Sequence, residues 1–88
     1  MEIKNTNEIK INEELTKVYI DVEFDKETEM KYNLKDSGVL VLIKNNEIQD
    51  IMLTDINMVP KNINLTKDEK EIVTRHLMNK RIVKRATL

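Results

Sequence analysis

The most apolar stretch of the sequence reads Val39-Leu40-Val41-Leu42-Ile43. It is rich in β-branched residues, and turn-forming residues bound it on both sides, Asp36 to Gly38 before it and Asn45-Asn46 after it. A short apolar run between turn signals is typical of a strand that is buried on both faces. We therefore expect residues 39–43 to form the central strand of a small sheet. A turn is expected at residues 35–38, where Gly38 is free to take a positive φ.

A β-hairpin is predicted directly after this strand. Asn45-Asn46 suits a two-residue type I′ turn, because asparagine tolerates the left-handed backbone conformation. The turn predicts three cross-strand pairs: Ile43 with Ile48, Leu42 with Gln49, and Leu40 with Ile51. Asp50 would then lie opposite Val41, which indicates an edge strand or a bulge near Asp50. A short helix over residues 47–53 is the alternative, since its apolar positions also fit helical spacing.

Alternating apolar and polar residues predict further strands on the N-terminal side. Residues 17–24 give a clear half-buried strand, and residues 30–34 give a second one, which a polar loop over residues 25–28 would join into a hairpin. A short edge strand is expected at residues 9–11, followed by a turn at residues 12–14. Residues 1–8 are the part of the chain most open to fraying.

A helix is predicted near the C-terminus. Thr66 and Glu69 match the Thr-x-x-Glu capping box that starts a helix. The apolar stripe expected to pack on the sheet consists of Ile72, Val73, His76 and Leu77. Two endings remain open. The helix continues to about Lys84, or it ends at Asn79 and residues 81–85 form a short strand.

These elements together predict a single α+β domain over residues 1–88. An antiparallel sheet of four strands, or five with the short strand at residues 9–11, would be packed by one C-terminal helix. A chain of 88 residues buries only about 60% of its unfolded surface. Burial against a second copy or a partner would therefore add to a marginal core.

The composition excludes several kinds of chemistry. Without cysteine the chain has no disulfides, thiolate zinc sites or cysteine nucleophiles, and it fits a reducing cytoplasm. His76 is the single histidine and Gly38 the single glycine, so neither a clustered metal site nor a glycine-rich phosphate loop is expected. No apolar run reaches the length of a membrane span. We expect a cytoplasmic, non-enzymatic protein with no cofactor and no small-molecule substrate.

Charge is distributed unevenly along the sequence. Residues 1–65 hold eight Lys and Arg against thirteen Asp and Glu, whereas residues 66–88 hold seven against three. The predicted partner-binding residues are the basic ones near the C-terminus: Arg75, Lys80, Arg81, Lys84 and Arg85. They could bind an acidic protein surface or neutralise phosphates. Alternatively, they could only stabilise the helix dipole and face the acidic sheet of the same chain or of a second copy. The low aromatic content argues against a single-strand stacking platform.

A second charged group is acidic and lies on the predicted hairpin. It comprises Asp21, Glu23, Glu27 and Glu29, interleaved with lysines. We interpret it as a solvated outward face, with general acid–base chemistry and mimicry of a nucleic-acid backbone as the alternatives.

The function that these patterns favour is a small binding or regulatory protein. Its basic C-terminal segment would engage an acidic partner, either a protein or a nucleic acid. The alternative is a homo-oligomeric structural or accessory protein, such as a dimer, whose C-terminal segment forms the subunit interface. The abundance of Lys, Asn and Ile is typical of AT-rich genomes and indicates a low-GC bacterium, its phage or a mobile element.

Overall fold

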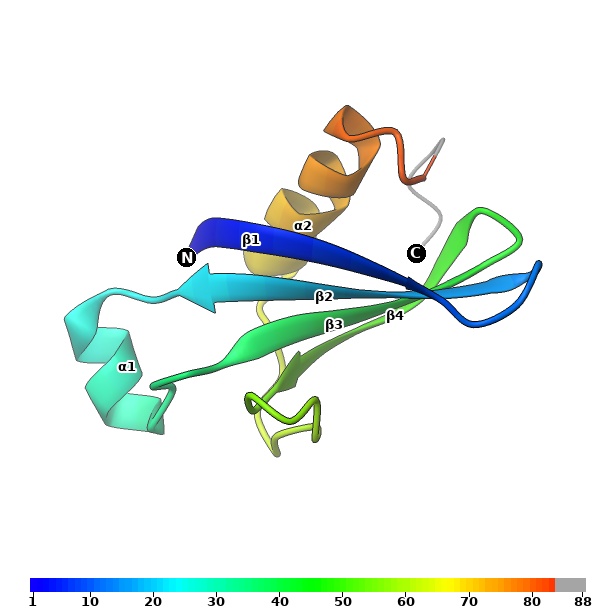
Figure 1. Cartoon of the computed structure of the whole chain (residues 1–88). Coiled ribbons are helices and arrows are strands. Elements are labelled where there is room, and N and C mark those ends of the chain that lie inside the picture. The colour runs from blue at the N-terminus through cyan, green and yellow to red at the C-terminus, as the bar shows by residue number, and fades with distance from the viewer. Residues whose placement is uncertain (84–88) are drawn as a thin grey trace.

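The computed structural model describes residues 1–83, which form one antiparallel sheet and two helices (Figure 1). The strands are β1 (Glu2–Lys10), β2 (Leu15–Glu23), β3 (Gly38–Lys44) and β4 (Glu47–Thr54), and the helices are α1 (Lys26–Tyr32) and α2 (Lys67–Asn79). The strand order is β1-β2-β3-β4, so each strand pairs with its neighbour in sequence. The predicted α+β class, with a small antiparallel sheet and a C-terminal helix packed on it, is confirmed.

The stretch Val39–Ile43 lies in β3, an interior strand of the sheet, as predicted. Val41 pairs with Val18 of β2, and Val39 pairs with Ile20. All four of these side chains are fully buried. Their β-branched shapes pack well on a pleated surface, and the face they share forms the centre of the hydrophobic core.

Helix α2 covers this core face of the sheet. In Figure 1 it passes behind β1 and β2, and the face turned to the viewer has no helix over it. Val73 and Leu77 are fully buried, as expected, whereas Ile72 is 42% exposed, so its place in the packing stripe was wrong. Thr74 is buried in its stead, and its hydroxyl donates to the Lys70 carbonyl of the preceding turn at 2.8 Å.

The predicted strand at residues 30–34 is wrong, because the chain forms α1 there. Asp25 caps the helix by accepting a hydrogen bond from the Thr28 N–H at 3.2 Å. Asn33 ends it in the left-handed region with φ 55°, which lets the Leu34 N–H donate to the Glu29 carbonyl at 2.9 Å. These two caps stabilise the helix more than the short alternation of apolar and polar residues favours a strand. Met30, an apolar position of the predicted strand, is 81% exposed.

Gly38 does not use the positive φ that was open to it in the predicted turn. Its φ is not positive, and the residue begins β3. A Cβ built on Gly38 would overlap the Tyr19 hydroxyl and lie 2.6 Å from Tyr19 Cε1. Glycine is needed here because the tyrosine ring lies across the strand. The left-handed residue of the preceding turn is Asp36, with φ 57°.

The hairpin between β3 and β4 has the predicted turn. Asn45 and Asn46 have φ values of 52° and 65°, as a type I′ turn requires. Ile43 pairs with Ile48 as expected, and β4 is an edge strand. The short-helix alternative is excluded.

Beyond that first pair, the predicted register of the hairpin is wrong. The register shifts so that Leu42 pairs with Asp50, Val41 with Ile51, and Leu40 with Met52. The extra residue is Gln49, which makes the expected bulge next to Asp50. The shift has a clear physical reason. It turns Ile51 and Leu53 toward the core and Asp50 away from it.

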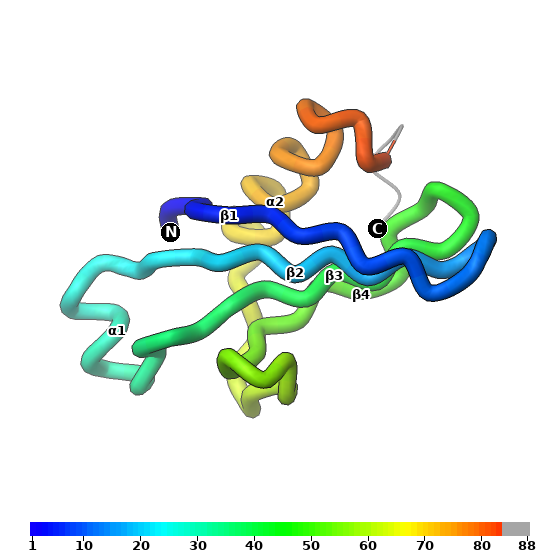
Figure 2. Tube along the Cα trace, in the orientation of Figure 1, coloured from blue at the N-terminus to red at the C-terminus, as the bar shows by residue number. Residues whose placement is uncertain are grey.

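Strand β1 is much longer than the predicted edge strand, and Figure 2 shows it running along the whole of β2. Its register shifts between Ile3 and Asn5, so Lys4 is the bulged residue. The turn after β1 forms as predicted, with Asn12 accepting hydrogen bonds from the Glu14 and Leu15 N–H groups. Both edge strands of the sheet thus carry a bulge, which protects a sheet from edge-to-edge pairing.

Helix α2 begins and ends with identifiable caps. The predicted capping box of Thr66 and Glu69 is present. The prediction that the helix continues to Lys84 is wrong, because it ends at Asn79. Among residues 80–83 no strand follows, and the rest of the proposed strand at residues 81–85 lies outside the described residues.

Candidate partner-binding surfaces

Three of the predicted partner-binding residues lie in the last two turns of α2 or directly after it. We call Arg75, Lys80 and Arg81 the basic end. All three side chains are exposed, and within residues 1–83 none of them pairs with a carboxylate. Lys84 and Arg85 lie outside the described part of the chain. The structure therefore presents three unneutralised cations on one end of a helix.

The backbone at the basic end is held in a Schellman motif. The Arg81 N–H donates to the Met78 carbonyl at 3.0 Å, and the Ile82 N–H donates to the Leu77 carbonyl at 2.9 Å. Arg81 is the left-handed residue of the motif, with φ 58°. Glycine or asparagine is usual at this position, and another residue there costs about 1–2 kcal/mol. An arginine is thus fixed at a position that disfavours it.

The flank of the basic end that faces β1 is partly polar. A hollow of about 330 Å³ is lined by Thr6, Glu8, Lys80 and Ile82. Thr6 Oγ1 and His76 Nε2 are hydrogen-bonded at 2.7 Å. Partial burial, together with the charge of Lys80, lowers the pKa of His76 below its usual value of 6.5. His76 therefore adds no positive charge to the basic end at neutral pH.

The sheet face opposite α2 forms a second exposed region, which we call the open face. The strand register places Tyr19, Lys17, Leu40, Leu42 and Met52 on it. Tyr19 and Leu40 are nevertheless buried. Tyr19 lies against Gly38, and its hydroxyl points to the Asp55 carbonyl at 3.4 Å. The loop at residues 55–60 thus closes part of this face.

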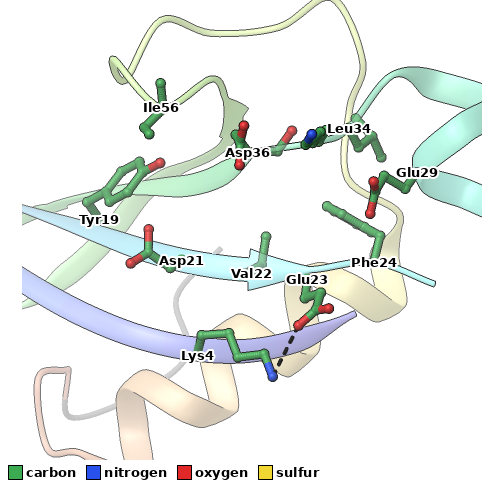
Figure 3. A pocket seen from close by; sticks show the side chains of 12 residues that line it. Lys4, Tyr19, Asp21, Val22, Glu23, Phe24, Glu29, Leu34, Asp36 and Ile56 are labelled. Atoms are coloured by element: carbon green, nitrogen blue, oxygen red, sulfur yellow. Dashed lines mark ion pairs between the residues drawn. The ribbon is translucent and has the colours of Figure 1, made fainter. Parts of the chain in front are cut away.

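A cavity of about 400 Å³ opens where β2, α1 and the loop at residues 55–60 meet. Figure 3 shows Tyr19, Phe24, Leu34 and Ile56 around it, with acidic side chains between them. We call it the acid-rimmed cavity, and its carboxylate residues are Asp21, Glu23, Glu29 and Asp36. Of these four carboxylates, only that of Glu23 is in an ion pair within residues 1–83, with Lys4 Nζ at 3.1 Å.

Ser37 lines the same cavity and is 4% exposed. Its hydroxyl is buried and has no hydrogen-bond partner among the described residues. Leaving a buried hydroxyl unpaired costs about 1–3 kcal/mol. Most buried polar groups in native proteins have a hydrogen-bond partner, so the Ser37 hydroxyl is an exception within residues 1–83.

The sequence pattern located the basic end but missed the cavity. Asp21 and Glu29 had been interpreted as part of a solvated hairpin face, because residues 30–34 were expected to be a strand. Helix α1 instead brings Glu29 toward the end of β2, and the following turn brings Asp36 and Ser37 there. The Asp25 cap and the Asn33 stop were the sequence signals that could have revealed this arrangement.

Two kinds of feature are absent from residues 1–83, a clustered metal site and a helix that could span a membrane. Within residues 1–83, no three His, Asp or Glu side chains are grouped as a metal site would require. In the same part of the chain, neither helix has the length and apolar character needed to cross a membrane. Comparison with models of protein families, with curated proteins and with solved structures finds no match.

Proposed function

We propose that this protein is a small non-enzymatic binding domain that docks on an acidic surface of a partner protein through its basic end. The observation that carries the proposal is the exposure of Arg75, Lys80 and Arg81 without any neutralising carboxylate in residues 1–83. Like-signed charges on one surface steer the approach of an oppositely charged partner and fix its orientation. The proposed location is the cytoplasm, with which a cysteine-free chain is compatible.

The backbone of Arg81 gives independent support. The Schellman motif fixes this residue in the left-handed region, where glycine would relieve the strain. Residues in sparsely populated backbone conformations are concentrated at functional sites. Arginine is also enriched at protein interfaces and prominent among their hot spots, since its planar head pairs with carboxylates in a bidentate way.

A protein partner is favoured over a nucleic acid by the surroundings of the basic end. Glu8 lines the same hollow as Lys80, and the chain as a whole has a net charge of −1. A phosphate backbone presents a long row of negative charges, and binding it usually takes an extended basic stripe. Three exposed cations without an extended stripe match a local acidic patch on a protein better.

The proposal is tested by affinity capture from the native host, with the wild-type chain and the Lys80→Glu/Arg81→Glu variant as baits. The matched control is Lys26→Glu/Lys31→Glu, which makes the same charge change on the exposed surface of α1. We expect wild type and control to retain the same partner, and the basic-end variant to retain less than about a tenth of it. Recovery that disappears after nuclease treatment would indicate a nucleic acid and contradict the proposal.

The alternative of a homo-oligomer joined by its C-terminal segment has its own test. Light scattering over a range of concentrations would show a dimer that dissociates on dilution, and Lys80→Glu/Arg81→Glu would weaken it. We expect instead that the mass of the purified chain does not depend on concentration.

A further inference from the structure

The outer side of α2, turned away from the sheet, carries apolar side chains that the core does not bury. Ile72 is 42% exposed and Met78 is 39% exposed. In Figure 1 the sheet lies on one side of α2, and no other helix or strand of residues 1–83 covers its outer side. We propose that this side of α2 binds in a groove of the partner protein that has an apolar floor and carboxylates along its rim. The inference rests on the function proposed above and adds the chemistry of the partner's site.

The distribution of apolar residues in α2 is unusual for a helix that covers a sheet. Such a helix normally turns its apolar side chains to the core and its polar ones to water. Here Thr74 is buried, and its hydroxyl is satisfied by the Lys70 carbonyl at 2.8 Å. Ile72 remains exposed. The helix thus buries a polar residue and leaves a larger apolar residue to water, where contact with a partner would bury it.

The exposed apolar residues of α2 lie on one ridge of side chains. Ile72, Arg75 and Met78 are spaced three residues apart, so they are neighbours along the helix surface. We call these three residues the α2 ridge. A single exposed apolar residue needs no explanation, because most protein surfaces have some. A row of anchors along one side of a helix is the feature by which amphipathic helices bind in apolar grooves.

The charges beside the α2 ridge determine the charge of the groove's rim. Arg75 is exposed in the middle of the ridge and is in no ion pair within residues 1–83. Lys80 and Arg81 follow shortly after Met78, the last residue of the ridge. An arginine packs its alkyl stem on apolar surface while its head pairs with a carboxylate. The complementary groove therefore has carboxylates next to its apolar floor.

Acidic residues in the first half of α2 determine how the helix lies in the groove. Asp68 and Glu71 are exposed, and they precede the α2 ridge. They would repel the carboxylates that pair with the basic end. The groove therefore holds α2 from Ile72 onward, with the start of the helix away from the acidic rim. Repulsion of this kind adds specificity to the attraction of the basic end.

Salt distinguishes a groove from a contact made by charges alone. At about 1 M salt the Debye length is about 3 Å, so attraction between exposed charges is largely screened, whereas apolar burial is not. The probe is the protein that the wild-type chain retains in the affinity capture described above. The bound protein is washed at about 0.1 M and at about 1 M sodium chloride. We expect the wild-type chain to keep part of it at the higher concentration.

Three variants locate the apolar contact. Ile72→Ser/Met78→Ser should retain about tenfold less of the captured protein at both salt concentrations, because two apolar side chains no longer leave water on binding. Ile72→Leu/Met78→Leu keeps the apolar surface and should bind within about twofold of wild type. Ile56→Ser/Val59→Ser is the matched control. It makes the same kind of change at positions that are 66% and 56% exposed, and it should leave retention unchanged.

The groove and the basic end can fail separately. Retention by Ile72→Ser/Met78→Ser equal to that of wild type, or an equal loss in the Ile56/Val59 control, would overturn the groove and leave the basic end as the docking site. Complete release from the wild-type chain at about 1 M salt would also overturn it. If the wild-type chain retains no protein at either salt concentration, the proposed function itself is contradicted, and the groove with it.

Discussion

At the scale of single residues, the contact between Gly38 and Tyr19 shows how one position can fix a surface. The tyrosine ring covers the glycine across two paired strands, and its hydroxyl points to the Asp55 carbonyl at 3.4 Å. Partial burial, reinforced by the charges of Asp21 and Asp55, raises the pKa of the Tyr19 hydroxyl. An aromatic side chain packed over a strand glycine compensates for the missing side chain of that glycine. Tyr19 also lines the acid-rimmed cavity.

Gly38→Ala is expected to destabilise the protein by about 1–3 kcal/mol, because the new methyl group would occupy the space of the Tyr19 ring. Urea denaturation measures the change in the free energy of unfolding. In the Tyr19→Ala background the same substitution should cost much less. Equal costs in the two backgrounds would show that the ring does not restrict position 38.

His76 is the residue whose protonation should affect stability. Burial lowers its pKa in the folded chain below 6.5, so the unfolded chain binds the proton more readily. Well above pH 6.5 the histidine is neutral in both states, and its titration has no effect on stability. As pH falls below 6.5, its effect is to lower the free energy of unfolding.

NMR titration of the imidazole ring in the folded protein should therefore give a midpoint below 6.5. His76→Gln should remove part of the loss of stability as pH falls below 6.5, while the hydrogen bond to Thr6 can be retained by the amide. A midpoint above 6.5 would contradict the assigned environment.

At the scale of secondary-structure elements, the residues that cap a helix or form a turn determined the local structure more often than hydrophobic periodicity did. The type I′ turn and the α2 capping box rest on particular residue types, and both were predictable from the sequence. Helix α1 was not recognised, because the alternation of residues 29–34 suggested a strand. Its own residues bury no side chain in the core, so the hydrophobic pattern carried no information about it. The local caps at Asp25 and Asn33 decided the structure there.

Arg81, which follows the end of α2, also determines the local backbone structure, and its effect on stability can be measured directly. Arg81→Gly should stabilise the protein by about 1 kcal/mol, because glycine adopts the left-handed conformation of the Schellman motif without strain. It should also weaken capture of the partner. Lys80→Gly is the matched control and should not stabilise, since Lys80 has an ordinary φ of −85°. Thermal unfolding distinguishes the two variants.

At the scale of the whole molecule, the charge asymmetry and the fold class followed from the sequence, whereas the arrangement of surfaces did not. The central strand at residues 39–43 and the packing of Val73 and Leu77 depend on apolar patterns that any α+β arrangement would need. The acid-rimmed cavity depends on a helix that the pattern concealed and on the path of the loop at residues 55–60. Such a site could be found only after the chain had been placed in three dimensions.

The two charged regions lie on different parts of the molecule. Lys80 of the basic end lines a hollow with Thr6 and Glu8 of β1, whereas the unpaired acids lie where β2, α1 and the turn before β3 meet. A partner bound at the basic end would therefore leave the cavity accessible.

The central claim, that the basic end contacts an acidic partner protein, is tested most directly by site-specific photo-crosslinking in the native host. A photoreactive residue is placed either at Asn79, exposed at the end of α2, or at Met30, exposed on α1. We predict that position 79 crosslinks to an acidic segment of another protein and that position 30 does not. Crosslinks from position 79 only to nucleic acid or to copies of this chain, or equal crosslinking from both positions, would contradict it.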